Sequence, residues 1–200
     1  KGQKTGFYLD QRLNRQRVGE WMRGRRVLNC FCYTGAFSVY ALARGAEAVL
    51  SVDSSAEALA QAQEQVSLNN LESGRAEWVE GDVFQMLRKL RDRGESFDAV
   101  ILDPPKFAPT AAQAEKAARG YKDINLLGFK LLRPGGVLAT FSCSGGIGAD
   151  LFQKIIAGAA ADAGVRASMV GTMTQGPDHP VGLEFPEGAY LKGLLCVRTE

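Results

Sequence analysis

Two side chains of this sequence have the types and positions to carry covalent chemistry. Cys143 lies in Ser-Cys-Ser-Gly-Gly (142–146), directly after an apolar run. Asp103 opens Asp-Pro-Pro-Lys-Phe (103–107), also directly after an apolar run. A cysteine in a polar, glycine-rich turn can act as a nucleophile, whereas most free cysteines are buried core residues. We interpret Cys143 as a nucleophile.

The prolines after Asp103 give its motif a second property. They fix φ and remove two backbone donors, so the motif forms a rigid shelf. A shelf suits a planar substrate, and we assign Pro104, Pro105 and Lys106 to substrate binding beside Asp103. The alternative is a stiff turn with a solvated aspartate. The remaining cysteines, which we interpret as core residues, are Cys30, Cys32 and Cys196.

A glycine turn followed by an acid is typical of a nucleotide-like cofactor site. The segment Asn29–Phe37 places Gly35 where a strand turns into a helix, with free N–H groups pointing outwards. It matches neither GlyXGlyXXGly nor a Walker loop, so plain strand-to-helix punctuation stays open. Asp53 follows 18 residues after Gly35 (53 − 35), where doubly wound folds hold a ribose. A solvated acid at a helix start is the alternative.

Two further residues are weaker candidates. Asp82, in Gly-Asp-Val-Phe (81–84), could accept a hydrogen bond from an adenine amine, with Val83 and Phe84 as apolar contacts. Acids are also common helix caps. His179, the single histidine, is by default a surface loop residue and alternatively a substrate contact.

Alternating strands and helices must position these residues. The Arg-rich segment Asp10–Arg23 is predicted to be helical. The predicted strands that follow are 26–31, 48–52, 76–80, 97–102 and 137–142, and the predicted helices are 36–44, 56–69, 83–93, one reaching Leu132, and 150–163. This alternation indicates right-handed crossovers and a parallel sheet covered on both faces. The predicted fold class is a doubly wound α/β domain with ligands at the carboxyl ends of its strands.

The C-terminal part of the chain contains two more strand-like runs, 165–170 and 190–197. The segment Gly171–Gly188 between them is too long for a simple hairpin turn. We predict that it reaches over the active site.

Composition and charge limit the possible functions. The chain has 200 residues, 46% hydrophobic and 23% charged, as expected for one soluble domain. No apolar run approaches the roughly 18–20 residues that cross a bilayer, so we expect a cytoplasmic protein without membrane contact. Scattered cysteines and a single histidine predict no metal site. A net charge of +2 is weak for holding a polyanion, and the chain begins at Lys1, so we expect a longer polypeptide to assist.

Taken together, the motifs resemble a known family. They are Leu-Asn-Cys-Phe-Cys-Tyr-Thr-Gly-Ala-Phe (28–37), Ser-Val-Asp-Ser (51–54), Asp-Pro-Pro-Lys-Phe (103–107), Arg-Gly-Tyr-Lys-Asp-Ile-Asn (119–125), Phe-Ser-Cys-Ser-Gly (141–145), Asp-His-Pro (178–180) and Tyr-Leu-Lys-Gly (190–193). Their order is that of the bacterial 23S rRNA cytosine-5 methyltransferases that carry an N-terminal PUA domain. The similarity begins at Gly-Phe-Tyr-Leu-Asp-Gln (6–11) and covers essentially the whole chain.

The resemblance implies a Rossmann-like class I S-adenosylmethionine-dependent methyltransferase domain over residues 1–200, with a short helical segment to about residue 24. Its mostly parallel seven-stranded sheet would have an antiparallel last strand, and an RNA-binding PUA domain would lie outside this chain. The implied cofactor residues are Phe31, Tyr33, Thr34 and Gly35 in one loop, Asp53 and Ser54 at the ribose, Asp82 and Val83 at the adenine, and Asp10, Gln11 and Arg12 nearby. The implied partner is 23S ribosomal RNA. The oligomeric state is open, with a homodimer as one option.

The chemistry of cytosine gives these residues roles. Carbon 5 is too poor a nucleophile to take a methyl group unaided, so Cys143 is expected to add to carbon 6 while Asp103 hydrogen-bonds nitrogen 3 or the amine. The target base must leave its stack. Many RNA cytosine-5 methyltransferases have a second cysteine in the motif that here reads Asp-Pro-Pro-Lys-Phe, so product release must use another group or water.

Two other functions stay open from the sequence. One is amino or ring-nitrogen methylation of a guanine or adenine, which needs no thiol. The other is a non-catalytic cofactor-binding or RNA-scaffolding module.

Overall fold

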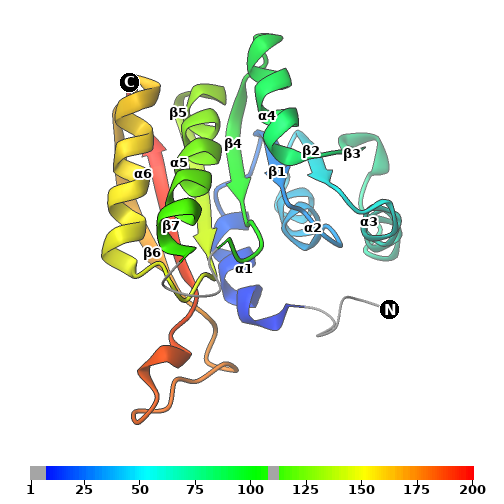
Figure 1. Ribbon diagram of the computed structural model, residues 1–200. Helices are drawn as coiled ribbons and strands as arrows, with labels where there is room; N and C mark the ends of the chain where they lie inside the picture. Colours follow the sequence, from blue (N-terminus) through cyan, green and yellow to red (C-terminus); the bar gives the residue numbers. More distant parts are fainter. Residues whose placement is uncertain (1–7, 108–112) are drawn as a thin grey trace.

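A seven-stranded sheet forms the centre of the computed structural model, which describes residues 8–107 and 113–200 (Figure 1). The strands are β1 (Arg26–Cys30), β2 (Ala48–Asp53), β3 (Ala76–Glu80), β4 (Phe97–Leu102), β5 (Leu132–Ser142), β6 (Ala167–Met173) and β7 (Lys192–Arg198). Their order in the sheet is β3-β2-β1-β4-β5-β7-β6. Strands β1 to β5 are parallel, and β7 is antiparallel to both of its neighbours. The predicted fold class, including the antiparallel last strand, is confirmed.

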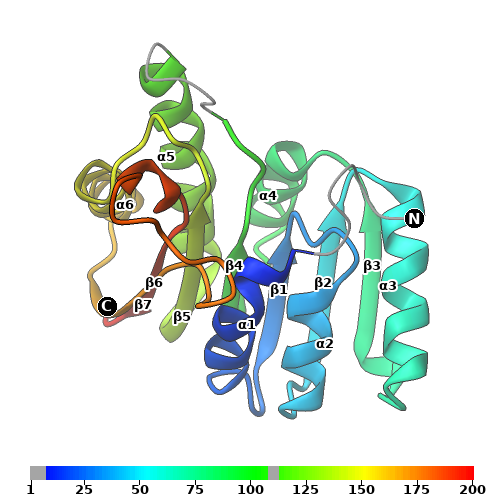
Figure 2. The same cartoon turned by 90° about the horizontal axis from the view of Figure 1, so that it is seen from below.

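Helices cover both faces of this sheet (Figure 2). One face carries α4 (Val83–Asp92), α5 (Ala114–Leu131) and α6 (Ala149–Ala163), and the other carries α1 (Arg12–Gly19), α2 (Ala36–Ala43) and α3 (Ala56–Leu68). Short 3-10 helices, η1 (Leu9–Gln11), η2 (Ser73–Arg75) and η4 (Pro186–Gly188), lie in the connections. Each face has its own core, one around Tyr121 and Phe152 and the other around Phe37 and Phe141.

The central strands are buried on both faces, which explains why the sequence predicted them from apolar runs. Leu28 of β1 and Val100 of β4 pack into one core, and Val27 and Ile101 of the same strands pack into the other. Parallel strands covered on both sides are continuous apolar runs. Within residues 8–107 and 113–200, no helix is long and apolar enough to cross a bilayer.

The N-terminal helix is shorter than predicted. Instead of one helix over Asp10–Arg23, the chain forms η1 and then α1, which ends at Gly19. It ends there because the chain must turn into β1, which it does through short i→i+3 bonds and a left-handed Gly24 at φ 67°. Residues 1–7, which include the start of the expected segment 1–24 and of the motif 6–11, lie outside the described residues.

The edge strand β6 was placed wrongly at 165–170. Val165 N–H instead bonds to Ala160 O (3.1 Å) and Gly164 N–H to Ala161 O (3.0 Å), a Schellman ending that makes residue 165 part of the α6 terminus. The strand starts at Ala167. Nearly all of its side chains are exposed, so no apolar pattern marked its position.

Strand β5 begins earlier than predicted, at Leu132 rather than at residue 137. The Pro-Gly-Gly segment 134–136 does not separate helix from strand, because it lies inside β5 as an irregularity where the pairing with β4 shifts register. Gly136 is required there, since a Cβ would lie 2.7 Å from Arg133 O.

Candidate active site

The predicted site residues converge at the carboxyl edge of the parallel strands. Five loops meet there, because each follows a strand that points the same way. They begin after β1 at Phe31, after β2 at Ser54, after β3 at Gly81, after β4 at Asp103 and after β5 at Cys143.

The loop after β1 is conformationally strained. Phe31 and Tyr33 have left-handed φ values of 59° and 50°, which non-glycine residues rarely adopt, and Gly35 follows at 73°. Cys32 N–H anchors the loop to Val52 O at 3.1 Å. Strain of this kind persists only where the surrounding structure holds it, and it is often found at ligand sites.

Gly35 is needed for a packing reason that the sequence did not indicate. We predicted that it lets the backbone approach a ligand. In the structure, a Cβ on Gly35 would lie 2.7 Å from Ala62 Cβ and 2.8 Å from the Trp78 ring. Close packing of the loop against α3 and β3 therefore requires glycine at this position.

Asp53 lies beside this loop and holds it in place. Its Oδ2 accepts a hydrogen bond from Tyr33 N–H (2.8 Å), and its Oδ1 accepts one from Ser55 N–H (3.0 Å). Each oxygen keeps a further lone pair for a ligand. Ser55 caps α3 by accepting from Ala58 N–H, and Ser54 is exposed beside it.

Thr34 provides an independent sign of a ligand site. Its Oγ1 is buried and has no hydrogen-bond partner in residues 8–107 and 113–200. Buried polar atoms are nearly always hydrogen-bonded, so such an atom in a strained loop fits a ligand that supplies the partner. The residues of this loop therefore fit a polar cofactor.

The third loop fits the adenine prediction only in part. Asp82 is exposed and caps α4 by accepting from Gln85 N–H at 2.9 Å. The side chain of Val83 is 4% exposed and belongs to the core, so it offers little surface to a ligand. Phe84, the next residue, is partly exposed.

Three aromatic side chains that follow different strands form a cluster at this edge. Phe31, Phe84 and Phe107 follow β1, β3 and β4, and their ring centroids are 5.8–6.3 Å apart. All three are partly exposed. We had not assigned Phe107 a role, although its position in the Asp-Pro-Pro-Lys-Phe motif was a signal.

Asp103 lies at the end of β4, and its carboxyl group is enclosed by protein although the residue keeps some exposed surface. Burial raises its pKa to about 7, assisted by the negative charge of Asp10, while a hydrogen bond from Gln11 and the charge of Arg15 oppose the shift. Gln11 Nε2 donates to Asp103 Oδ1 at 2.9 Å. Near neutral pH the group is therefore present both as acid and as carboxylate.

Cys143 lies at the end of β5, with its Sγ 4.0 Å from Pro104 O of the shelf. It is partly exposed, whereas Cys30, Cys32 and Cys196 are buried as predicted. Burial and then the charge of Asp103 raise the pKa of the Cys143 thiol to about 11. Two lysines oppose this shift.

These lysines are Lys106 on the shelf and Lys192 at the start of β7. Lys106 is exposed and lies over the Tyr190 ring at 6.0 Å. Lys192 Nζ is fixed by hydrogen bonds to Ser144 O (2.7 Å) and Tyr190 O (2.8 Å). Because Lys192 is held and partly buried, water screens its charge less than that of Lys106.

The shelf and the Cys143 turn are joined directly. Phe107 N–H and the Tyr121 hydroxyl both lie within hydrogen-bond distance of Ser144 Oγ, at 3.1 and 2.9 Å. Pro104 is buried, and Pro105 is exposed. The relative position of shelf and thiol is therefore fixed by the fold.

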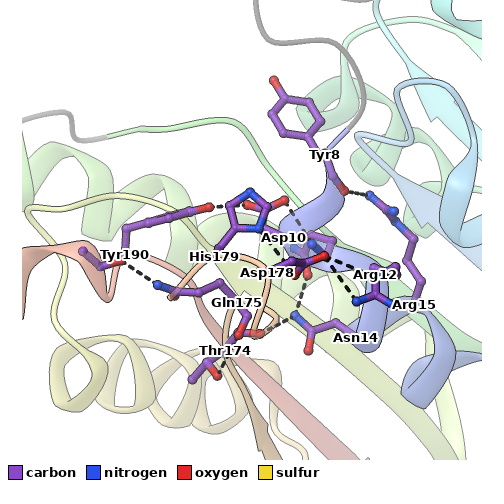
Figure 3. A network of polar contacts seen from close by, with 12 residues as sticks. Tyr8, Asp10, Arg12, Asn14, Arg15, Thr174, Gln175, Asp178, His179 and Tyr190 are labelled. Carbon is purple, nitrogen blue, oxygen red and sulfur yellow. Dashed lines mark hydrogen bonds and ion pairs between the residues drawn. The ribbon is translucent and has the colours of Figure 1, made fainter. Parts of the chain in front are cut away.

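The segment 174–191 packs on the N-terminal residues rather than over the sheet edge alone (Figure 3). Tyr190 Oη donates to Asp10 Oδ2 (2.7 Å), and Asn14 Nδ2 donates to Thr174 O (3.0 Å). Arg12, one of the expected cofactor residues, instead pairs with Asp178 at 3.3 Å on the surface.

His179 lies next to Asp178 in this segment, with Nδ1 3.5 Å from its carboxylate. Gln11 contacts Asp103 rather than a cofactor loop, and Asp10 accepts from its N–H at 3.0 Å. Among the residues described, no group of three or more histidine, cysteine or acidic side chains could hold a metal ion.

Several known proteins are similar to this chain in sequence. The sequence model of the S-adenosylmethionine-dependent methyltransferases matches residues 1–195. The chain is 55% identical over 194 residues to ribosomal RNA large subunit methyltransferase I of Aeromonas hydrophila, covering 97% of this chain and 49% of that protein. It is 57% identical to the protein of the same name from Tolumonas auensis, with the same coverage. The chain thus spans about half the length of these curated relatives.

A solved structure supports the fold and its ligand class. SMU.776, described as a methyltransferase and solved in complex with SAH, superposes with a TM-score of 0.85 at 26% identity. The superposition covers 96% of this chain and 50% of that one.

Proposed function

The chain belongs to the S-adenosylmethionine-dependent methyltransferase family, and we propose that it is the catalytic domain of an enzyme that forms 5-methylcytosine in 23S rRNA. The names of the relatives from Aeromonas and Tolumonas support a large-subunit rRNA substrate. The cysteine and aspartate at the sheet edge support cytosine carbon 5 as the target. The N-terminal PUA domain, a cytoplasmic location and the oligomeric state stay predictions.

The cofactor site is proposed on the loops after β1, β2 and β3. Phe31, Tyr33, Thr34 and Gly35 form its first loop, and the orphaned Thr34 Oγ1 supports a bound polar group there. Asp53 would accept from the ribose hydroxyls, beside Ser54. Asp82 would accept from the adenine amine, with the Phe31, Phe84 and Phe107 rings as an apolar wall and Val83 contributing its backbone. The cofactor supplies an electrophilic methyl group on sulfur.

The single observation that carries the proposal is the placement of Cys143. Of the four cysteines, all of which lie in the described residues, it alone is partly exposed, and it lies at the rim beside the shelf that begins with Asp103. Methylation of an amine or a ring nitrogen needs no thiol. Carbon 5 of cytosine does, because it becomes nucleophilic only after a nucleophile adds to carbon 6.

We propose the following roles for the two residues. The Cys143 thiolate forms an S–C6 bond, and the electrons of the C5–C6 double bond shift towards nitrogen 3, where Asp103 donates as an acid. Carbon 5 would then take the methyl group as its bond to the sulfonium sulfur breaks, with that electron pair staying on sulfur. Loss of the carbon 5 proton to a base or water re-forms the C5–C6 double bond as the C6–S bond breaks and the thiolate leaves. Nitrogen 3 returns its proton to the Asp103 carboxylate.

The charges of Asp103 and Cys143 are coupled, and this coupling favours a protonated Asp103 together with a Cys143 thiolate. The thiol is protonated at neutral pH because burial and the Asp103 charge raise its pKa to about 11. Protonation of Asp103 removes that negative charge, so the acid form that nitrogen 3 needs also favours the thiolate.

We propose four further residues as substrate contacts: Pro104, Pro105, Lys106 and His179. The motif 103–107 has no second cysteine, so product release relies on another group or on water.

The test is tritium-methyl transfer from labelled S-adenosylmethionine to unmodified large-subunit rRNA by the full-length protein, followed by nucleoside analysis. We expect label in 5-methylcytosine, loss of transfer in Cys143→Ala and unchanged cofactor affinity in that variant. Cys196→Ala, a cysteine in the core, is the matched control. Transfer retained by Cys143→Ala, or label in a guanine or adenine, would reject the proposal in favour of nitrogen methylation. No cofactor binding at all would indicate a non-catalytic module.

A further inference from the structure

We propose that Gln11 is a positioning residue for Asp103: its side-chain amide, held in one orientation by Asn14, fixes carboxyl oxygen Oδ1 and leaves Oδ2 to meet the substrate base. This inference deepens the proposed function and rests on it. It also gives Gln11 a role different from the cofactor contact that the sequence suggested.

The orientation of the Gln11 amide is set by its two neighbours. Its Nε2 donates to Asp103 Oδ1 (2.9 Å), and its Oε1 accepts from Asn14 Nδ2 (2.7 Å). A flipped amide would place its oxygen against the carboxyl oxygen and its N–H₂ against the Asn14 N–H₂, so both bonds would be lost. Gln11 is only 3% exposed, and water cannot easily replace them.

Asn14 is itself fixed. Its Nδ2 carries two hydrogens, and the second bonds to Thr174 O at 3.0 Å. A chain of hydrogen bonds thus runs from the backbone of Thr174 through Asn14 and Gln11 to Asp103. Helix α1, η1 and the segment 174–191, which are distant in the sequence, together determine how the Asp103 carboxyl group is held.

The charges that face Asp103 make this neutral donor important. Arg15 and Asp10 approach from the N-terminal residues with opposite signs, and Cys143 approaches from the end of β5. After burial, the hydrogen bond from Gln11 has the largest effect on the Asp103 pKa, and it lowers that pKa. Without Gln11, the pKa of Asp103 would rise above its present value of about 7.

Only one oxygen of Asp103 is engaged in this way. In the part of the chain that the structure describes, no residue donates a hydrogen bond to Oδ2. A proton on this group is therefore expected on Oδ2, because Oδ1 accepts from Gln11. Oδ2 is then the atom that can donate to nitrogen 3 of a cytosine.

The experiment is the pH profile of kcat/KM for methyl transfer to large-subunit rRNA by the full-length protein, because this profile reports pKa values of the free enzyme. Gln11→Met removes the donor at similar volume. A hydrogen bond to a charged group changes a protonation equilibrium about tenfold, so the limb governed by Asp103 should move up by about one pH unit. Gln11→Glu adds a like charge and should move it further.

Two more variants test whether the shift of the Asp103 limb depends on the orientation of the Gln11 amide. Asn14→Leu frees the Gln11 amide to rotate and should shift the same limb by less than Gln11→Met. Arg17→Ala is the matched control, since Arg17 also joins α1 to the C-terminal part of the chain, through Thr172 O at 2.7 Å, and its profile should coincide with that of the wild type.

A structural role alone would lower kcat/KM at every pH without moving the limb, and that result in both Gln11→Met and Asn14→Leu would overturn the inference. If Gln11→Met does not fold, Asn14→Leu decides alone. The two proposals fail separately: wild-type protein that forms 5-methylcytosine with an unshifted limb in the variants rejects only the role of Gln11. Methyl transfer to another base with a shifted limb rejects only the proposed target.

Discussion

Replacement of Asp103 by asparagine should stabilise the folded protein at neutral and alkaline pH. Burial is the main cause that raises the pKa of this carboxyl from 3.8 to about 7. The ionised form is therefore less favourable in the folded chain than in the unfolded chain. Asparagine cannot ionise, and it keeps an oxygen that can accept the Gln11 N–H.

The pH dependence follows from the two pKa values. Below about pH 4 Asp103 is protonated in both states, and its pKa shift has no effect on stability. Between about pH 4 and 7 only the unfolded chain releases the proton, so the wild type loses stability as the pH rises. Above about pH 7 Asp103 is ionised in both the folded and the unfolded chain, so the loss in free energy of unfolding no longer changes with pH. The gain from Asp103→Asn should therefore be absent in acid and complete in alkali.

The magnitude follows from the size of the shift. A rise from 3.8 to about 7 is about three units, and roughly 1.4 kcal/mol per unit gives a ceiling of about 4 kcal/mol. The asparagine amide must also be desolvated, and its bond with Gln11 is no longer charge-assisted. We expect a gain of about 2 kcal/mol in the free energy of unfolding at alkaline pH, or about 4–8 °C in Tm.

The assay is urea unfolding of wild type and variant in parallel buffers from about pH 5 to about pH 8. Taking the difference at each pH removes the contributions of all other titrating groups. Asp92→Asn is the control, because that side chain is 65% exposed and should change stability by less than about 0.5 kcal/mol. A difference that does not grow with pH, or a variant less stable at pH 8, would refute the reasoning. The same variant should lose methyl transfer, so stability and activity would change in opposite directions.

Further changes test other parts of the site. Lys192→Gln keeps N–H donors but removes the charge, so the pKa of the Cys143 thiol should rise and iodoacetamide alkylation at a given pH should slow. Lys106→Gln should slow alkylation more, because the charge of Lys106 has the larger effect on this pKa, and an unchanged pH profile in both variants would contradict the reasoning. Gly35→Ala should lower the free energy of unfolding by about 3 kcal/mol, measured in urea, because its Cβ would meet side chains of α3 and β3 at 2.7–2.8 Å and φ is 73°. Tyr190→Phe removes the hydroxyl that donates to the buried Asp10, and urea unfolding should show a loss of about 2 kcal/mol; a loss within error would indicate that water replaces the bond.

The sequence predicted strands β1 to β4 to within one residue at each end and displaced the exposed edge strand β6. Strand β4 was predicted to the residue, because it is apolar apart from Asp98 and ends at Leu102, directly before the Asp-Pro-Pro motif. Strand β6 was displaced, since most of its side chains are exposed and its position depends on pairing with β7. Pairing energy between backbones leaves no pattern in the side chains of an exposed edge strand.

In α/β folds, functional residues lie at the carboxyl ends of the parallel strands. This rule correctly placed Asp103, Asp53 and Cys143 at one edge of the sheet. The partner of Asp103 was not predictable in this way. Gln11 lies 92 residues before it, and the contact depends on how α1 packs on the sheet. Likewise, Val83 was predicted to face a ligand, but the helical position after the Asp82 cap turns its side chain into the core.

Several departures from local rules of stability lie at the carboxyl end of this sheet. Phe31 and Tyr33 are left-handed there, Thr34 Oγ1 has no partner among the described residues, and Asp103 is a carboxyl whose ionisation is opposed by burial. Left-handed Asn70 is elsewhere, but its residue type tolerates that conformation. At the other end of β4, by contrast, Asp98 accepts from Arg26 N–H (2.9 Å) and pairs with Arg133 (3.0 Å). Both oxygens of Asp98 have partners, whereas only Oδ1 of Asp103 accepts a hydrogen bond among the described residues, and a ligand that binds at the Asp103 end explains this difference.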